Sequence, residues 1–238
     1  MVVIPARFGS QRLPGKPLLA KTGKPLIRHV YERVRMARRV DRVVVATDDE
    51  RILRAVEEFG GEAVMTSPKH ESGTDRTAEA VRRIPCDAVI NVQGDEPEID
   101  PALIDRLAET LRKDARADWV TAAVPTRGSK SLANPATVKI ARDAEGYALY
   151  FSRSAIPHER GHAFPRKALL HVGIYGFRRS ALMRFAKSRP SPLEKTERLE
   201  QLRALELGMR IRVLDTPRSE RSIDTPADYR AFVERCRK

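Results

Sequence analysis

Residues 1–17 read MVVIPARFGSQRLPGKP, and this stretch decides the fold. A hydrophobic strand, Val2–Ile4, leads into a loop rich in cations and glycine. That loop holds Arg7, Gly9, Ser10, Arg12, Gly15 and Lys16. Glycine lets backbone N–H groups approach an anion, while Arg and Lys supply charge and donors. The stretch therefore predicts a polyphosphate site just after a first strand, with an ordinary basic surface turn as the alternative.

Two common phosphate motifs do not describe this loop. Five residues separate Gly9 from Gly15 where a P-loop has four, and Lys16 precedes Pro17 rather than Ser or Thr. The glycine spacing of a dinucleotide-binding turn is also missing from it. The loop thus predicts an anion site of another kind.

Composition limits the classes of protein to consider. The 238 residues are 41% hydrophobic, enough for one large α/β domain, and 45 Lys and Arg against 32 Asp and Glu give a formal charge of +13. Such a charge raises the possibility of a nucleic-acid partner, but the basic residues are spread along the chain, which favours solvated faces. Two distant cysteines, no long apolar run and a strand at the N-terminus predict a cytoplasmic protein with no membrane insertion and no signal peptide.

Strands and helices alternate through the first half of the chain. Apolar runs at 43–47, 63–65 and 88–92 predict buried strands, and helical spacing follows Pro25 and recurs at 52–59 and 103–111. Strands that are apolar on both faces are typical of a parallel sheet covered on both sides. The second half changes character: residues 137–142 and 147–152 predict antiparallel strands, and 157–167 a loop. One helix is expected from Ser191 to Gly208.

Two aspartates are candidates for a metal site. Asp95 follows the strand at 88–92, where a carboxylate is well placed for Mg²⁺, although it could instead cap a turn. In the segment Asp224-Thr-Pro-Ala-Asp228, Thr225 and Asp228 fit a helix capping box, which leaves Asp224 for another role. Asp48 and Asp49 are explained most simply as a helix start.

Three further groups of residues have competing interpretations. Ser72, Gly73 and Thr74 could bind a base or phosphate, or only cap a helix. The pair His171 and Tyr175 shares one face of an expected strand, and Glu197 and Gln201 share one face of an expected helix. Spacing by itself favours ordinary packing for both pairs.

A series of motifs resembles one known family along almost the whole chain. The motifs are VIPARxxSxRLPGKPL at 3–18, VATD at 45–48, SGTDR at 72–76, NVQGDEP at 91–97, ALYFSRxxIP at 148–157, HVGIYGF at 171–177, SPLE at 191–194, LEQLR at 199–203 and DTPxD at 224–228. In this order they resemble the 3-deoxy-manno-octulosonate (KDO) cytidylyltransferases, or CMP-KDO synthetases. The segment between Pro157 and Leu170 is shorter than is usual there.

The resemblance implies a fold, a reaction and a set of site residues. It implies one Rossmann-like nucleotidyltransferase domain over 1–238, with about 125–180 contributing to the sugar pocket and to a homodimer. It implies that CTP and KDO give CMP-KDO and pyrophosphate, for lipopolysaccharide synthesis. The nucleotide-binding residues would be Ala6, Arg7, Ser10, Arg12, Lys16, Ser72, Gly73, Thr74 and Asp95. The sugar-binding residues would be Gln93, Arg153, His171, Tyr175, Glu197 and Gln201. The catalytic residues would be Arg12, Lys16, Asp95 and Asp224, with Mg²⁺ held by Asp95 and Asp224.

Two other functions remain open from the sequence. A cytidylyltransferase for a related acidic sugar, such as an amino-substituted KDO or a sialic acid, differs from the main reading only in pocket side chains. A non-catalytic basic protein that binds nucleic acid is the alternative from another class, but the chain lacks aromatic stacking motifs and a recognition-helix signature.

Overall fold

The structure is a computed structural model that describes residues 1–9, 12–70, 72–126, 129–165, 167–217 and 221–237. It divides into two compact units, one made of residues 1–109 and 220–238 and the other of residues 110–219. The first unit is therefore discontinuous in sequence, because the end of the chain returns to it. The prediction of one domain with a contributing segment at 125–180 stays a prediction.

Unit 1 contains four parallel strands in the order β3 (Ala63–Met65), β2 (Val43–Thr47), β1 (Val2–Ala6) and β4 (Ala88–Asn91). Every residue of β1 and β2 is buried, as expected for strands that are covered on both faces. Because the strands are parallel, their carboxyl ends lie at one edge of the sheet. The sequence prediction of this parallel sheet is confirmed.

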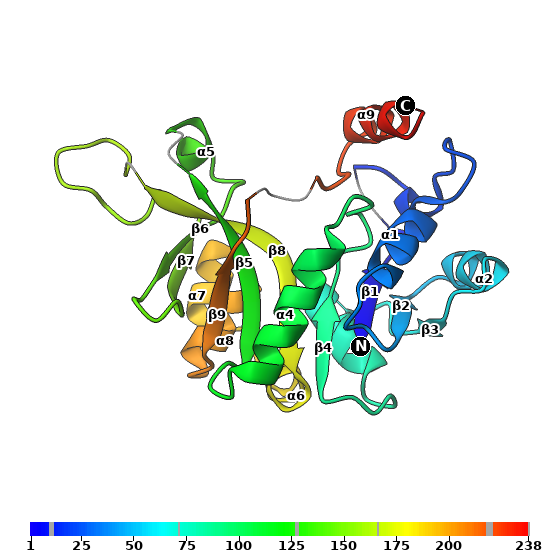
Figure 1. Ribbon diagram of the computed structural model, residues 1–238, viewed down its shortest axis with the longest axis horizontal. Helices are drawn as coiled ribbons and strands as arrows, with labels where there is room; N and C mark the ends of the chain where they lie inside the picture. The colour runs from blue at the N-terminus through cyan, green and yellow to red at the C-terminus, as the bar shows by residue number, and fades with distance from the viewer. Residues whose placement is uncertain (10–11, 71, 127–128, 166, 218–220, 238) are drawn as a thin grey trace. The chain divides into compact units, whose positions relative to one another are not determined.

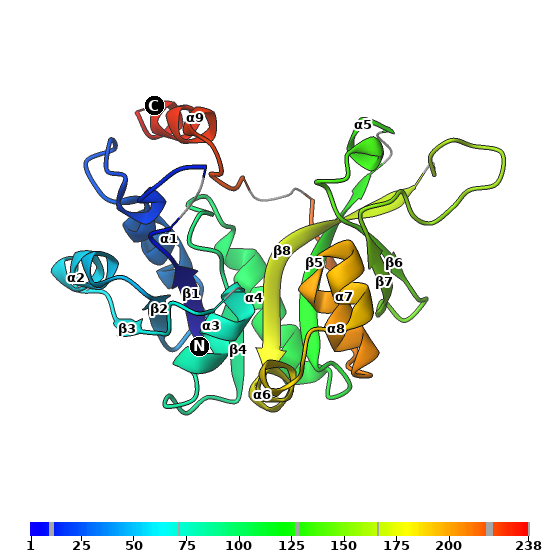
Figure 2. The same cartoon turned by 180° about the vertical axis from the view of Figure 1, so that it is seen from behind.

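Helices cover both faces of these four strands. Helix α1 (Leu26–Arg35) lies on one face and α3 (Gly73–Ala80) on the other, as the two opposite views show (Figures 1 and 2). Helix α2 (Glu50–Glu58) connects β2 to β3, α4 (Pro101–Lys113) follows β4, and the short helix η1 (Lys16–Leu18) ends the N-terminal loop. The predicted helix positions are confirmed.

The last helix, α9 (Pro226–Cys236), fastens the end of the chain to unit 1. Its Tyr229, Phe232 and Val233 form a buried cluster with Leu26 of α1 and with Ile223. The predicted capping box is present: the Thr225 hydroxyl accepts the Asp228 N–H and the Asp228 carboxylate accepts the Thr225 N–H. Hydrogen bonds from Thr225 lower the pKa of Asp228, so the cap stays charged.

Unit 2 is built on β5 (Trp119–Thr126), which pairs antiparallel with β8 (Ala168–Arg178) and parallel with β9 (Ile211–Asp215). Strands β6 (Lys139–Arg142) and β7 (Ala148–Ser152) form the predicted hairpin, and β6 also pairs with β8. Trp119 is fully buried, and its ring lies 4.6 Å from that of Phe177 and 5.0 Å from that of Phe185. These edge-on aromatic contacts form the core of the unit.

The helices of unit 2 depart from expectation. The helix predicted from Ser191 is two helices, α7 (Pro192–Glu197) and α8 (Glu200–Glu206), because Arg198 adopts φ +53° in the left-handed region. Such a residue ends a helix, so Glu197 and Gln201 do not share one helix face. Helices α5 (Ser129–Ala133) and α6 (Arg179–Lys187) were not predicted.

Candidate active site

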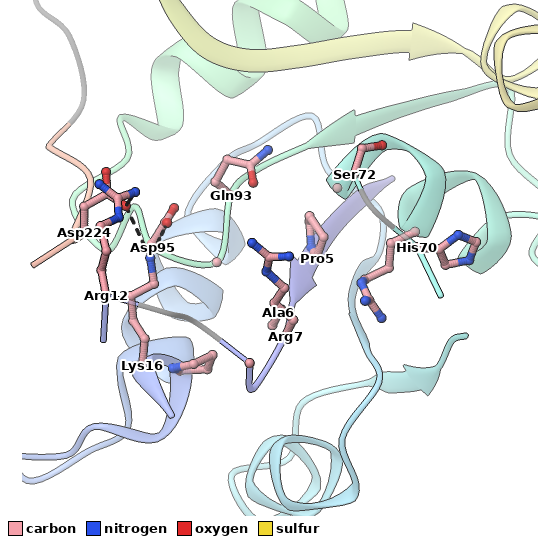
Figure 3. Close-up of a pocket in the computed structure, with 15 residues that line it drawn as sticks. Pro5, Ala6, Arg7, Arg12, Lys16, His70, Ser72, Gln93, Asp95 and Asp224 are labelled. Carbon is pink, nitrogen blue, oxygen red and sulfur yellow. Dashed lines mark hydrogen bonds and ion pairs between the residues drawn. The ribbon is translucent and has the colours of Figure 1, made fainter. Parts of the chain in front are cut away.

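A cavity of about 570 Å³ opens at the carboxyl ends of β1 and β4 in unit 1 (Figure 3). Ligands of parallel sheets bind at this edge, so the cavity lies where the sequence predicted a site. Its walls come from the N-terminal loop, the start of α3, the loop after β4 and the segment before α9. The lining residues are Pro5, Ala6, Arg7, Gly9, Arg12, Lys16, Pro17, His70, Ser72, Gly73, Arg76, Gln93, Gly94, Asp95 and Asp224.

The N-terminal loop folds back on itself before η1. Gly15 has φ +65°, its N–H donates to the Phe8 carbonyl oxygen at 3.2 Å, and a Cβ there would lie 3.2 Å from the Phe8 ring. Glycine is favoured at such a position. Arg7 and Arg12 are exposed, so their guanidinium groups are accessible to an anion. Ser10, which was predicted to bind nucleotide, lies outside the described residues.

An ion-pair cluster of Lys16, Asp95 and Asp224 lies on one side of the cavity (Figure 3). The Lys16 ammonium nitrogen lies 2.6 Å from Asp95 Oδ2 and 3.7 Å from Asp224 Oδ1, and it donates to the Ile223 carbonyl oxygen at 2.8 Å. Arg12 also contacts Asp224 Oδ1, at 2.9 Å. The four residues predicted to be catalytic are therefore brought together, although more than 200 positions separate Arg12 from Asp224.

Two glycines allow the loops around the cavity to pack against β1. A Cβ on Gly94 would lie 2.8 Å from the carbonyl oxygen of Pro5, closer than real Cβ contacts come. A Cβ on Gly73 would lie 3.2 Å from the Pro5 ring and 3.5 Å from the side-chain amide of Gln93. The close approach of Gly94 holds Asp95 beside the end of β1, and Gly73 does the same for the start of α3.

The start of α3 supplies the third wall. The Ser72 hydroxyl accepts the Asp75 N–H at 3.0 Å, so the helix-cap interpretation holds, and Ser72 lines the cavity as well. Thr74 is fully buried behind it. A capped helix start that lines the same cavity as Lys16 and the arginines adds to the attraction for an anion.

Among the lining residues that the sequence prediction missed, Arg76 and His70 have side chains that can carry charge. Arg76 is only 3% exposed, and its guanidinium donates to Thr66 Oγ1 and Asp48 Oδ2, both at 2.6 Å. Asp48 therefore pairs with Arg76, and only Asp49 caps α2, by accepting the Arg51 N–H at 2.9 Å. His70 Nε2 contacts the Glu79 carboxylate. The only signal for Arg76 was its place in the SGTDR motif.

Unit 2 holds five of the six residues predicted to bind sugar. The rings of His171 and Tyr175 lie 5.3 Å apart, so the expectation that they share a face is confirmed despite the bulge that separates them in β8. Burial lowers the pKa of His171 to about 4 and, with the charge of Glu200, raises the pKa of Tyr175 well above its usual value. Both are neutral at pH 7, and His171 Nε2 lies 3.0 Å from Thr121 Oγ1.

Arg153 and Glu197 form one hydrogen-bonded group. Glu197 accepts from the Ser152 hydroxyl at 2.7 Å and from the Arg153 N–H at 3.0 Å. The Arg153 guanidinium donates to the carbonyl oxygens of Glu197, Pro135 and Arg198. Gln201 is buried in α8, and the sixth predicted residue, Gln93, lines the cavity of unit 1.

The comparison with known proteins places the chain in a family. A family model described as cytidylyltransferase matches residues 1–211. The chain belongs to the cytidylyltransferase family. A relative of this cytidylyltransferase from Geobacter sulfurreducens is 48% identical over 98% of this chain and 97% of its own, and one from Idiomarina loihiensis is 45% identical over 100% and 96%. Both are named 3-deoxy-manno-octulosonate cytidylyltransferase.

A solved structure supports the same fold. CMP:2-keto-3-deoxy-manno-octonic acid synthetase complexed with CTP superposes on this cytidylyltransferase with a TM-score of 0.93 at 43% identity, over 98% of this chain and 96% of the other. A Bacillus anthracis putative glucose-1-phosphate thymidylyltransferase, 13% identical with a TM-score of 0.69 over 100% of this chain and 95% of its own, shares the fold alone. The expected nucleotidyltransferase fold is confirmed. Among the described helices, none has the length and apolar character to cross a membrane.

Proposed function

We propose that this cytidylyltransferase transfers the cytidylyl group of CTP to 3-deoxy-D-manno-octulosonate and releases pyrophosphate. The observation that carries the proposal is the cluster of Lys16, Asp95 and Asp224 in the wall of a cavity that arginines and glycines also line. The names of relatives that are up to 48% identical over nearly the full length support CTP and KDO as the substrates.

The reaction requires one bond to form and one to break. The anomeric hydroxyl oxygen of the sugar attacks the α-phosphorus of CTP and loses its proton, and the bond from that phosphorus to the bridging oxygen breaks as pyrophosphate leaves. Both substrates are anions, so the site must hold them in line and offset charge that grows on the phosphates. No covalent enzyme intermediate is needed.

The N-terminal loop binds the leaving group in this proposal. Arg7 and Arg12 are exposed at the cavity and offer forked donors to the β- and γ-phosphates. The Lys16 side chain is only 13% exposed, so its charge acts in a partly dehydrated place and is screened less than a surface charge. Lys16 therefore stabilises the negative charge that develops as pyrophosphate departs.

Asp95 and Asp224 are the residues that would hold Mg²⁺. The donor set fits, because Mg²⁺ takes one or two carboxylates together with phosphate oxygens and water. Both carboxylates already face one cation, the Lys16 ammonium, within ion-pair distance. Within the described residues, no group of three or more His, Cys, Asp or Glu side chains is arranged to hold a metal ion, so these two carboxylates would need phosphate oxygens and water to complete the ligand set. Bound Mg²⁺ would supply a Lewis acid that polarises the phosphate and makes the attacking hydroxyl more acidic.

In this proposal the polar residues of unit 2 recognise the sugar. Arg153 uses three of its five N–H groups on backbone carbonyl oxygens, which fixes its guanidinium and leaves donors for the sugar carboxylate. The neutral imidazole of His171 and the neutral phenol of Tyr175 suit sugar hydroxyl groups, which both donate and accept.

The homodimer remains part of the proposal. Leu149 of β7 is 62% exposed and lies within the segment 125–180 that was predicted to contribute to the dimer. We expect light scattering to give twice the chain mass, and Leu149→Asp to lower it to the monomer mass. Leu193→Asp, at an exposed leucine outside that segment, is the control. A monomeric wild-type protein would contradict the proposal.

The test of the function is pyrophosphate release across a matrix of nucleoside triphosphates and acidic sugars, with and without Mg²⁺. We expect CTP and KDO with Mg²⁺ to give the highest kcat/KM, above amino-substituted KDO and sialic acid. A higher kcat/KM with another sugar would overturn the substrate assignment, and full activity after chelation of divalent ions would overturn the metal. A salt-dependent shift on DNA or RNA with no pyrophosphate release would indicate the nucleic-acid alternative.

A further inference from the structure

Lys139 is a buried cation that the proposed reaction does not use. It lies in β6 and is 0% exposed. Its ammonium nitrogen donates to the carbonyl oxygens of Asn134 at 3.0 Å, Thr137 at 2.9 Å and Arg153. Burial, and then the nearby charge of Arg153, lower the pKa of Lys139. A buried ammonium is costly unless it is paired or hydrogen-bonded, so its presence in the core of unit 2 calls for a reason.

The three carbonyl contacts decide what Lys139 can do. A lysine ammonium has three N–H donors, and all three have a backbone acceptor here. No donor remains for a substrate, and a fully buried nitrogen that donates three hydrogen bonds is badly placed to act as a base. Lys139 is therefore a positioning residue, not a catalytic one.

The contacts of Lys139 converge on residues that are assigned to the sugar. Arg153, whose carbonyl oxygen Lys139 holds, donates its own N–H to the Glu197 carboxylate at 3.0 Å. Residue 138, next to Lys139, accepts the His171 N–H at 2.8 Å. Lys139 is also paired with Ser152 of β7, whose hydroxyl donates to Glu197 at 2.7 Å. We call Lys139, Ser152, Arg153 and Glu197 the Lys139 junction.

The backbone next to the junction is strained. Arg198 follows Glu197 with φ +53°, a conformation that a residue with a Cβ adopts at a cost. Its carbonyl oxygen accepts from the Arg153 guanidinium, as does that of Glu197. The junction thus fixes both ends of Arg153, its backbone through Lys139 and its side chain through the carbonyl oxygens of Glu197 and Arg198.

We propose that Lys139 is the positioning residue of the acceptor-sugar site, setting the place of Arg153 and Glu197 without touching substrate. This inference rests on the proposed function. It predicts that loss of Lys139 weakens use of the sugar and leaves CTP binding intact, because the cavity that we assign to CTP is lined by residues of unit 1.

The test compares Lys139→Met with wild type and with Ile140→Ala. Methionine keeps the length of the side chain and removes the donors. Ile140 is the neighbouring buried residue of β6, on the opposite face, so its truncation loosens the strand without touching the junction. Calorimetry gives the Kd of CTP, and pyrophosphate release gives kcat and the sugar KM.

We expect Lys139→Met to lower kcat/KM for the sugar by about 10²-fold, the effect of misplacing a binding group by about 1 Å, with the CTP Kd within about twofold of wild type. Ile140→Ala should lower the melting temperature and leave the sugar KM near wild type. A wild-type sugar KM in Lys139→Met, or an equal rise in Ile140→Ala, would overturn the inference.

Lys139→Arg provides a test that does not depend on the folding of Lys139→Met. Lys139→Arg keeps the charge and several donors, so it should fold and show a sugar KM between those of wild type and the methionine variant, with an unchanged CTP Kd. If Lys139→Met does not fold, Lys139→Arg tests the inference alone. A sugar KM equal to that of wild type, or a parallel loss of CTP affinity, would then refute the positioning role. A wild-type protein that does not release pyrophosphate with KDO would instead overturn the proposed function, and this inference with it.

Discussion

Gly94→Ala should damage the active site through one contact. The added Cβ would lie 2.8 Å from the Pro5 carbonyl oxygen, about 0.6 Å inside the 3.4 Å at which ordinary contact begins. Pro5 cannot retreat easily, since β1 is paired on both sides and Pro5 lies opposite Ala46 of β2. The loop that carries Asp95 must then move by a similar distance, away from the 2.6 Å contact between Asp95 and Lys16.

The size of the effect follows from that displacement. Overpacking of this kind costs about 1–3 kcal/mol of the free energy of unfolding, and each kcal/mol lowers the melting temperature of a chain this long by about 2–4 °C. Misplacement of a catalytic group by somewhat less than 1 Å should lower kcat by about 10- to 100-fold.

The assay is pyrophosphate release at saturating CTP and sugar, with thermal unfolding measured in parallel. Gly9→Ala is the matched control, because Gly9 lines the same cavity and nothing lies within 4 Å of a Cβ there. We expect that control to keep the wild-type melting temperature. Wild-type turnover and stability in Gly94→Ala would refute the view that this close approach positions Asp95.

Three other substitutions test the site. Lys16→Met should lower kcat by about 10²-fold with little change in melting temperature, and an unchanged rate would remove Lys16 from the reaction. Asp224→Asn should raise the Mg²⁺ concentration needed for half-maximal rate by at least about 10-fold, since a charged ligand is lost; an unaltered Mg²⁺ titration would contradict the metal assignment. Burial lowers the pKa of His171 to about 4 in the folded chain, from an ordinary value of 6.5 for histidine. Between these values the unfolded chain binds the proton, so the free energy of unfolding should fall as pH drops from 6.5 towards 4, by at most about 3 kcal/mol. In denaturant titrations, the free energy of unfolding of His171→Gln should change less between pH 6.5 and 4 than that of wild type. An equal pH dependence would show that His171 does not cause the loss of stability.

Much of unit 1 could be predicted because its signals are local. Apolar runs mark β1, β2 and β4, and Pro25 and the Thr225–Asp228 box mark helix starts. The convergence of Lys16 with Asp95 also followed from parallel strands that end at one edge, whereas Asp224 was assigned to the site by the family resemblance.

The features that could not be predicted depend on contacts between distant residues. The Asp48–Arg76 pair joins the ends of β2 and α3, and nothing within either segment indicates the partner. The break at Arg198 has no glycine or asparagine to signal a left-handed residue, and the Arg153 side chain that contacts its carbonyl oxygen is 45 positions away. The apolar helix periodicity therefore predicted one helix through Arg198. Arg76 was missed for the same reason, since its role in the cavity wall depends on the fold.

The return of the chain end to unit 1 sets an order in time for a newly made molecule. Lys16 and Asp95 are synthesised early, whereas Asp224 and the Ile223 carbonyl that holds the Lys16 ammonium come last. At about 5–20 residues per second, a ribosome spends on the order of ten seconds between them. During that interval the Lys16 ammonium can neutralise Asp95, so no lone carboxylate is left in a half-built site. Chains cut short before residue 224 would carry the N-terminal loop without the second carboxylate of the proposed metal site, and without the α9 residues that pack on Leu26.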